Sequence, residues 1–215
     1  LFSKKGGFMS PFFVTVLSVN ITMQDIRYDF IDKKGNYDLL DKYVKNKSLR
    51  RIIDIGAWWG PWTLWWCNRA ENVEIFEPNA DILPKLQHNL KKLPHCTLHQ
   101  TALGNTSCKV NMEYENHTGT YHIKNTEGNI SCKKLDDYEF ENVDIIKIDV
   151  EGYEIPVLQG ATQTILKNKP WIQIEANNSG ERYGRTKRDI LTFLDKLGMN
   201  RVYKRWPDQI WNFDN

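Results

Sequence analysis

The sequence has no apolar run long enough to cross a membrane, no Cys-x-x-Cys motif and no strong excess of either charge. Its longest apolar stretch is Pro11–Val19, whereas a membrane helix needs about 20 residues. The four cysteines are therefore expected to be free thiols in a reducing compartment. A net charge of +2 is too small to indicate nucleic-acid binding. These absences favour a soluble cytoplasmic protein with no membrane partner and no zinc site.

The length and composition fit a chain with one substantial core. It has 215 residues, of which 40% are hydrophobic. We expect a single domain over residues 1–215. Residues 1–50 are predicted to add strands over Phe12–Asp32 and a helix over Gly35–Val44, for which Asn36 is a candidate cap. Residues 51–215 are expected to form the core that carries the function.

The segment Arg51–Gly60 (RIIDIGAWWG) predicts a buried strand followed by a glycine turn. Its isoleucines form a short apolar run, and Gly56, Ala57 and Gly60 let the backbone turn sharply and approach a ligand. The proline that follows suits the first turn of a helix over Pro61–Trp66. Strand, glycine turn and helix in this order place a nucleotide-like ligand at the carboxyl edge of a parallel sheet.

A second strand is predicted over Val73–Phe76, and it ends in Glu77. An acid about 20 residues after the glycine turn can accept hydrogen bonds from both ribose hydroxyls of an adenosine ligand. The turn lacks the full Gly-x-Gly-x-x-Gly spacing that holds a pyrophosphate. An adenosine ligand without a pyrophosphate fits better, and S-adenosylmethionine is the obvious candidate.

Four blocks of the sequence stand out: DIGAWWG (Asp54–Gly60), FEPN (Phe76–Asn79), IIKIDVEGYEIPVLQGA (Ile145–Ala161) and WIQIE (Trp171–Glu175). They resemble the FkbM family of S-adenosylmethionine-dependent methyltransferases. The resemblance implies a Rossmann-like class I methyltransferase fold, with a mostly parallel seven-stranded sheet and a reversed last strand. The hydrophobic pattern by itself indicates an α/β fold. One departure is Trp58, where the family usually has Asn.

The remaining elements alternate between strands and helices. Helices are expected over Asp81–Lys92, Tyr153–Leu166 and Arg185–Leu197. Strands are expected over Thr97–Gln100, Val143–Ile148, Trp171–Glu175, Met199–Trp206 and Gln209–Phe213. A β-hairpin insertion over Lys109–Ile130, with a polar loop at Asn116–His122, would overhang the mouth of the site.

Most of the candidate cofactor-binding residues lie in these blocks or at the ends of the strands. Glu77 is assigned to the ribose, and Asp54 is expected to orient the glycine turn and to reach the methionine amino group through water. The resemblance implies that residues 101–103 contact the adenine. The full set is Asp54, Gly56, Ala57, Trp58, Gly60, Thr63, Glu77, Pro78, Asn79, Thr101, Ala102, Leu103 and Asp149.

The candidate catalytic residues are acids and histidines placed where a methyl acceptor would approach. For a hydroxyl acceptor, the enzyme must align the acceptor and remove its proton. Asp149 is the first candidate for this base, with His117 and His122 as rivals. A divalent cation held by Asp149 and Glu175 is a less favoured alternative. Asp149 and Glu151 could instead cap the helix from Tyr153.

The leading functional hypothesis is O-methylation of a hydroxyl on a small molecule or sugar, as the resemblance implies. The first alternative is an RNA 2′-O-methyltransferase, in which Lys147, on the same strand face as Asp149, would form part of a lysine–aspartate–lysine–glutamate set. The modest charge speaks against nucleic acid. The second alternative is a non-catalytic protein of the same fold, in which Trp58 partly fills the pocket.

Overall fold

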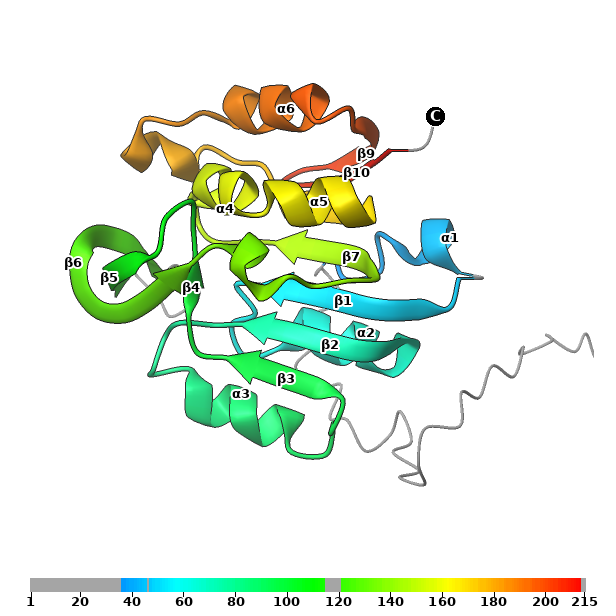
Figure 1. Cartoon of the computed structure of the whole chain (residues 1–215), viewed down its shortest axis with the longest axis horizontal. Coiled ribbons are helices and arrows are strands. Elements are labelled where there is room, and N and C mark those ends of the chain that lie inside the picture. The colour runs from blue at the N-terminus through cyan, green and yellow to red at the C-terminus, as the bar shows by residue number, and fades with distance from the viewer. Residues whose placement is uncertain (1–35, 46, 115–120, 214–215) are drawn as a thin grey trace, which may run out of the picture.

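A seven-stranded sheet in the order β3-β2-β1-β7-β8-β10-β9 forms the centre of the protein (Figure 1). The structure, a computed structural model, describes residues 36–45, 47–114 and 121–213. The parallel strands are β1 (Leu49–Ile55), β2 (Ala70–Phe76), β3 (Cys96–His99), β7 (Val143–Ile148) and β8 (Trp171–Glu175). Strand β10 (Asp208–Asn212) runs antiparallel to β8 and to β9 (Asn200–Arg205). The predicted α/β fold, mostly parallel sheet and reversed last strand are confirmed. The strands predicted over Phe12–Asp32 lie outside the described residues.

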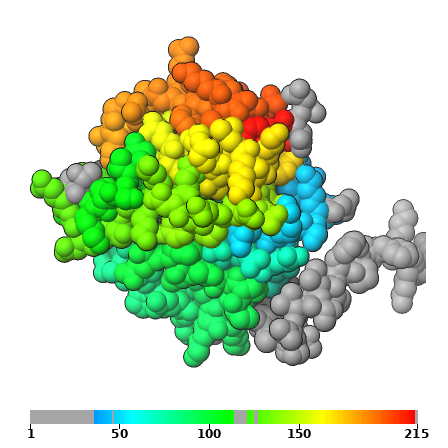
Figure 2. Space-filling view, in the orientation of Figure 1, coloured from blue at the N-terminus to red at the C-terminus, as the bar shows by residue number. Residues whose placement is uncertain are grey.

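Helices cover both faces of this sheet and divide the core in two. They are α1 (Asp41–Val44), α2 (Pro61–Trp66), α3 (Leu83–Leu90), α4 (Glu154–Gly160), α5 (Thr162–Asn168) and α6 (Lys187–Lys196). Because side chains alternate along a strand, Ile53 of β1 packs with α4, α5 and α6, whereas Ile52 packs with α1, α2 and α3. Trp62 and Trp66 are fully buried on the second face, as expected for packing residues. In Figure 2, α4 and α5 (yellow) cover part of the first face.

Two predicted helices are shorter than expected. Of the described residues 36–44, only Asp41–Val44 are α-helical, and the side chain of Asn36 bonds to Asp208 and does not cap this helix. The helix predicted over Tyr153–Leu166 starts at Glu154 and breaks at Ala161 into α4 and α5. At the break, Gly160 packs against the carbonyl of Gly104, which a Cβ would approach to 1.9 Å.

A second, three-stranded sheet lies beyond the carboxyl ends of β1, β2 and β7 (Figure 1). It consists of β4 (Ala102–Leu103), β6 (Tyr121–Lys133) and β5 (Cys108–Tyr114), with β5 and β6 antiparallel. The predicted hairpin insertion is thus confirmed. Tyr121 and His122, however, begin β6 instead of belonging to the polar loop. Within the described residues, the structure contains no helix of the length and apolarity that a membrane crossing requires.

Candidate active site

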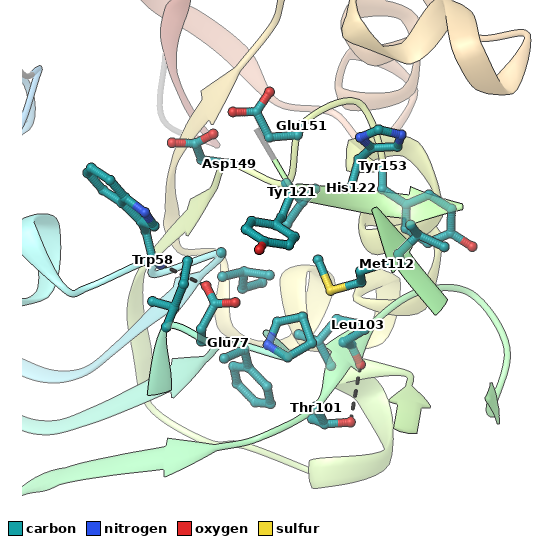
Figure 3. Close-up of a pocket in the computed structure, with 18 residues that line it drawn as sticks. Trp58, Glu77, Thr101, Leu103, Met112, Tyr121, His122, Asp149, Glu151 and Tyr153 are labelled. Atoms are coloured by element: carbon teal, nitrogen blue, oxygen red, sulfur yellow. Dashed lines mark hydrogen bonds between the residues drawn. The ribbon is translucent and has the colours of Figure 1, made fainter. Parts of the chain in front are cut away.

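One pocket opens at the carboxyl edge of the main sheet, beneath the hairpin. Its lining brings together eight of the predicted site residues: Gly56, Trp58, Glu77, Pro78, Thr101, Ala102, Leu103 and Asp149. In the view of Figure 3, the ring of Tyr121 lies between Glu77 on one side and Asp149 and Glu151 on the other. The pocket therefore has two ends, one at the end of β2 and one at the end of β7.

The glycine turn after β1 is held tightly between two neighbouring strands. Gly56 has a positive φ of 77°, and a Cβ at this position would lie 1.8 Å from the carbonyl oxygen of Asp149. Its N–H donates to the carbonyl oxygen of Phe76 at 3.0 Å. Only glycine fits such a position. Trp58 follows with a φ of 53°, which is unusual for a bulky residue, and its backbone N–H points at Glu77.

Glu77 is a buried carboxylate fixed by the backbone. Its Oε2 accepts the N–H of Trp58 at 2.8 Å, and its Oε1 accepts the N–H of Asn79 at 2.9 Å. Burial raises the pKa of Glu77 to about 7, although these two hydrogen bonds favour the charged form. Glu77 thus lines the pocket with both carboxylate oxygens oriented, and its role in binding a ribose stays a prediction.

Asp54 lies beneath the pocket and not in its lining. It is fully buried, and its Oδ2 accepts the hydroxyl of Thr63 at 2.5 Å. Lys147 lies beside it, with Nζ 3.4 Å from Oδ1 of Asp54, 3.3 Å from Oδ2 of Asp149 and 2.9 Å from the carbonyl oxygen of Gly56. Burial alone would lower the pKa of Lys147, but the two carboxylates outweigh burial and raise it. Lys147 thus ties the glycine turn to the acid after β7.

Three further predicted residues support the turns without lining the pocket. Ala57 is buried among the side chains of the α2 face. Gly60, with a φ of 93°, precedes α2 and packs against Leu86. The Oδ1 of Asn79 accepts the N–H of Asp81 at 3.0 Å. Cofactor-binding roles for these residues, and for Asp54 and Thr63, stay predictions.

The wall opposite the glycine turn comes from β4 and from the hairpin. Thr101, which precedes β4, donates its hydroxyl to the carbonyl oxygen of Ser131 at 2.8 Å, so it fastens β4 to β6. The hairpin contributes Met112 and Tyr121, and α4 is preceded by Tyr153, which also lines the pocket. Tyr121 donates its hydroxyl to Asp81 at 3.1 Å. The sequence analysis did not identify Met112, Tyr121 and Tyr153 as site residues, although it placed the first two in the predicted hairpin segment.

Three acids cluster at the other end of the pocket. Carboxylate oxygens of Asp149, Glu151 and Glu175 all lie within 4.8 Å of one another. Burial, reinforced by the neighbouring acids, raises the pKa of Glu151 to about 7 and that of Glu175 to about 10. At neutral pH the cluster therefore retains protons. Carboxylate oxygens are also the ligands that a hard divalent cation prefers, so this donor set fits the less favoured cation alternative.

The turn that presents Glu151 is built by a fourth acid. Glu151 has a φ of 53° and Gly152 a φ of 103°. The Oε1 of Glu154 accepts the N–H groups of Val150 at 3.3 Å and of Gly152 at 3.0 Å. No side chain caps α4 at Tyr153. Glu154 thus satisfies the N–H groups of this turn from within the helix, and the alternative in which Asp149 and Glu151 stabilise the helix start stays a prediction.

Of the two candidate histidines, the structure describes only His122. His122 lines the pocket and is buried, with Nε2 3.5 Å from Oε1 of Glu113. His117 lies outside the described residues, so its catalytic role stays a prediction.

The chain is similar to known methyltransferases. A family model described as the methyltransferase FkbM domain matches residues 54–200. Hexuronic acid methyltransferase AglP from Haloferax volcanii is 25% identical over 177 residues, which cover 75% of this chain and 73% of that protein.

Two solved structures show the same fold. Methyltransferase FkbM from Methylobacillus flagellatus KT matches with a TM-score of 0.56 and 20% identity over 77% of this chain, and the match spans only 44% of that chain. N-methyltransferase NodS from Bradyrhizobium japonicum WM9, in complex with S-adenosyl-L-homocysteine, matches with a TM-score of 0.50 and 12% identity over 89% of this chain and 91% of that chain.

Proposed function

This chain belongs to the FkbM methyltransferase family, and we propose that it transfers a methyl group from S-adenosylmethionine to a hydroxyl of a carbohydrate or similar small molecule. One observation carries the proposal: a single pocket joins Glu77, which suits a ribose, to Asp149 and Glu151, which suit a hydroxyl acceptor. The hexuronic acid methyltransferase relative supports a carbohydrate acceptor.

The residues at the β2 end fit the adenosine part of the cofactor. Glu77 offers a carboxylate already oriented by two backbone N–H groups. Apolar side chains, including Phe76, Leu103 and Met112, form walls that suit an adenine ring. When bound, the cofactor supplies an electrophilic methyl group on a sulfonium. The chain's own task is then to hold the ribose, to exclude water and to orient the acceptor.

The residues at the β7 end fit the acceptor. Lys147 fixes Asp149 at 3.3 Å, so that its carboxylate can orient a hydroxyl by hydrogen bonding. Glu151, whose pKa burial raises to about 7, is suited to share in removing the proton because a general base works best near the operating pH. Glu175 lies beside this pair and, because its pKa is raised to about 10, keeps its own proton at neutral pH and adds no third negative charge. We assign Asp149 and Glu151 jointly to acceptor activation.

The RNA alternative depends on Lys147 acting on the substrate, and the contacts of Lys147 speak against that role. Lys147 is buried and engaged with Asp54, Asp149 and the Gly56 carbonyl, so it serves as a tie within the protein. A lysine that acts on an RNA hydroxyl would instead have to reach the bound substrate.

The proposal is tested by product analysis. The protein is incubated with S-adenosylmethionine and, in parallel, glucuronic acid, its methyl glycoside, neutral hexoses and a short RNA. We expect a mass increase of one methyl group on a sugar, stable to mild base, which distinguishes an ether from an ester. Asp149→Asn serves as the inactive control. Methylation of the RNA alone, or of a carboxylate, would contradict the proposed reaction.

A further inference from the structure

Two cysteines face each other at the base of the hairpin. Cys108, the first residue of β5, and Cys132 of β6 are direct partners in the antiparallel ladder, and both are free thiols. Directly opposed residues in such a ladder have Cα atoms about 4.5 or 5.5 Å apart and project from the same face. Disulfide-bonded cysteines have Cα atoms about 4.4–6.8 Å apart. The backbone therefore already holds this pair at a spacing that a disulfide accepts.

The side-chain surroundings bring the two sulfurs together. Cys132 belongs to a small apolar cluster with Ala102, Val110 and Ile123, and Cys108 packs against it. Burial, and after it the adjacent Cys108 thiol within hydrogen-bonding reach, raise the pKa of Cys132 to about 12. The Sγ of Cys132 would lie 3.0 Å from a Cβ at Gly104. Both thiols thus point into the same confined space.

The two thiols differ in access, which sets the order of reaction. Cys108 is half-buried, whereas Cys132 is buried. A shallow groove runs along both cysteines, and its charged lining residues are Lys109, Lys133 and Asp137, which leave it with a net positive charge. This positive charge suits an anionic oxidant that reacts with thiols, such as glutathione disulfide. Cys108 is therefore the thiol that meets an oxidant first.

We propose that Cys108 and Cys132 form a reversible disulfide that fastens β5 to β6, with a low-molecular-weight disulfide as the oxidant. The Cys108 thiolate attacks one sulfur of the oxidant, whose S–S bond breaks and releases one thiolate. Cys132 then loses its proton to solvent and attacks the Cys108 sulfur, which releases the second thiolate. Two protein thiols are oxidised to one disulfide, and the oxidant is reduced to two thiols.

The bond would act on the wall of the pocket. Cys132 pairs in parallel with Ala102 of β4, and Ala102 and Leu103 line the pocket. A disulfide holds its two sulfurs at about 2.05 Å, so it locks β6, and with it the paired Ala102 of β4, to β5 and leaves this wall less able to adjust to a ligand. We expect oxidation to weaken binding of S-adenosylhomocysteine by at least about threefold. The expected loss of S-adenosylhomocysteine binding rests on the proposed function, whereas formation of the disulfide does not.

Peptide mapping tests the disulfide directly. The full chain is treated with glutathione disulfide, alkylated and digested with trypsin without reductant. Cleavage after Lys92, Lys109, Lys124 and Lys133 places Cys108 in peptide 93–109 and Cys132 in peptide 125–133. We expect a linked pair two hydrogens lighter than the sum of the peptides, which disappears on reduction. A lasting glutathione adduct on Cys108 without this link would overturn the proposal.

The chain provides matched controls. Cys96 shares a peptide with Cys108, so the mapping is repeated with Cys96→Ser, which should keep the link, and with Cys108→Ser, which should abolish it. A link between Cys67 and Cys96, which lie near each other but are not ladder partners, would also overturn the proposal.

The calorimetric readout uses the Cys96→Ser protein before and after oxidation. An unchanged Kd for S-adenosylhomocysteine in fully linked protein would refute the effect on the pocket. If the reduced protein also fails to bind S-adenosylhomocysteine, the proposed function is wrong. Peptide mapping still decides whether the disulfide between Cys108 and Cys132 forms.

Discussion

The two ends of the pocket hold their carboxylates in opposite ways. At the β2 end, Glu77 is a single acid whose two oxygens each accept a backbone N–H. At the β7 end, Asp149, Glu151 and Glu175 crowd within 4.8 Å, and Lys147 balances only part of their charge. A carboxylate fixed by backbone donors is suited to hold a ligand in place. Crowded acids, of which Glu151 and Glu175 have raised pKa values, are suited to hold and share protons.

The difference also shows in how each end is built. The β2 end depends on the N–H of Asn79, two residues from Glu77, and on the N–H of Trp58 in the glycine turn. The β7 end depends on the positive φ values of Glu151 and Gly152, on Glu154 in the next helix and on Glu175 from another strand. If this division is correct, changes at the β2 end should affect binding of the cofactor product, and changes at the β7 end should affect turnover.

The largest expected effect comes from Asp149→Asn. Loss of the carboxylate that orients the acceptor should lower kcat by about 100- to 1,000-fold, with the Kd for S-adenosylhomocysteine unchanged within about twofold. Steady-state kinetics and calorimetry measure the two quantities. Asp144→Asn, at the other end of β7 and bonded to the N–H of Arg50, is the matched control. An equal loss of affinity and turnover in Asp149→Asn would mean that the ends are not separable.

Glu77→Gln should produce the reverse pattern. The ribose hydroxyls would lose a charged acceptor, which is worth about 1.5–3 kcal/mol, so the Kd for S-adenosylhomocysteine should rise about 30-fold. At saturating cofactor, kcat should fall far less. Glu71→Gln, an exposed position on the same strand, should bind normally. Normal binding by Glu77→Gln would remove Glu77 from the site.

The pH dependence of S-adenosylhomocysteine binding should differ between the native protein and Glu77→Gln. The pKa of Glu77 is raised to about 7, and its ionised form is the better acceptor for two hydroxyls. Affinity for S-adenosylhomocysteine should therefore fall about 10-fold between pH 8 and pH 6 as the carboxylate is protonated. Calorimetry across this range should show a flat profile for Glu77→Gln. A flat profile for the native protein would contradict the assignment.

The smallest effect concerns stability at the crowded end. The pKa of Glu175 is raised from 4.5 to about 10, so its contribution to stability is present below pH 4.5 and is lost as the pH rises toward 10. Glu175→Gln is neutral at every pH and should raise Tm by about 2–4 °C at pH 8, and by less at pH 5. Thermal unfolding at both values measures this difference. An equal shift at both would indicate a packing effect instead.

Sequence patterns predicted the β2 end well because its geometry is local. An isoleucine strand, Gly56 and Glu77 stand in a fixed order, and each needs only its neighbours in the chain or the adjacent strand. The length of α4 was overestimated because the break at Ala161 depends on Gly104, a residue more than 50 positions away. Local periodicity carries no information about that contact.

The hairpin itself was predicted, but the residues that it contributes to the pocket wall, and the Glu151 turn, could not be predicted, for the same reason. Tyr121 reaches the pocket only through the register of β5 and β6, which shifts at Asn111. In a simple capping pattern, Glu151, which precedes the helix, would accept the N–H groups of the turn. Here Glu154 accepts them, because Glu151 adopts a positive φ that sequence alone does not indicate for a non-glycine residue. Both features are set by tertiary packing.

Calorimetric titration of S-adenosylhomocysteine into the intact reduced protein, alongside Asp149→Asn and Glu77→Gln, tests the central claim most directly. The account predicts micromolar binding by the native protein and Asp149→Asn, and binding about 30-fold weaker by Glu77→Gln. Absence of binding by the intact protein would contradict it, and would indicate that Trp58 closes the pocket to the cofactor.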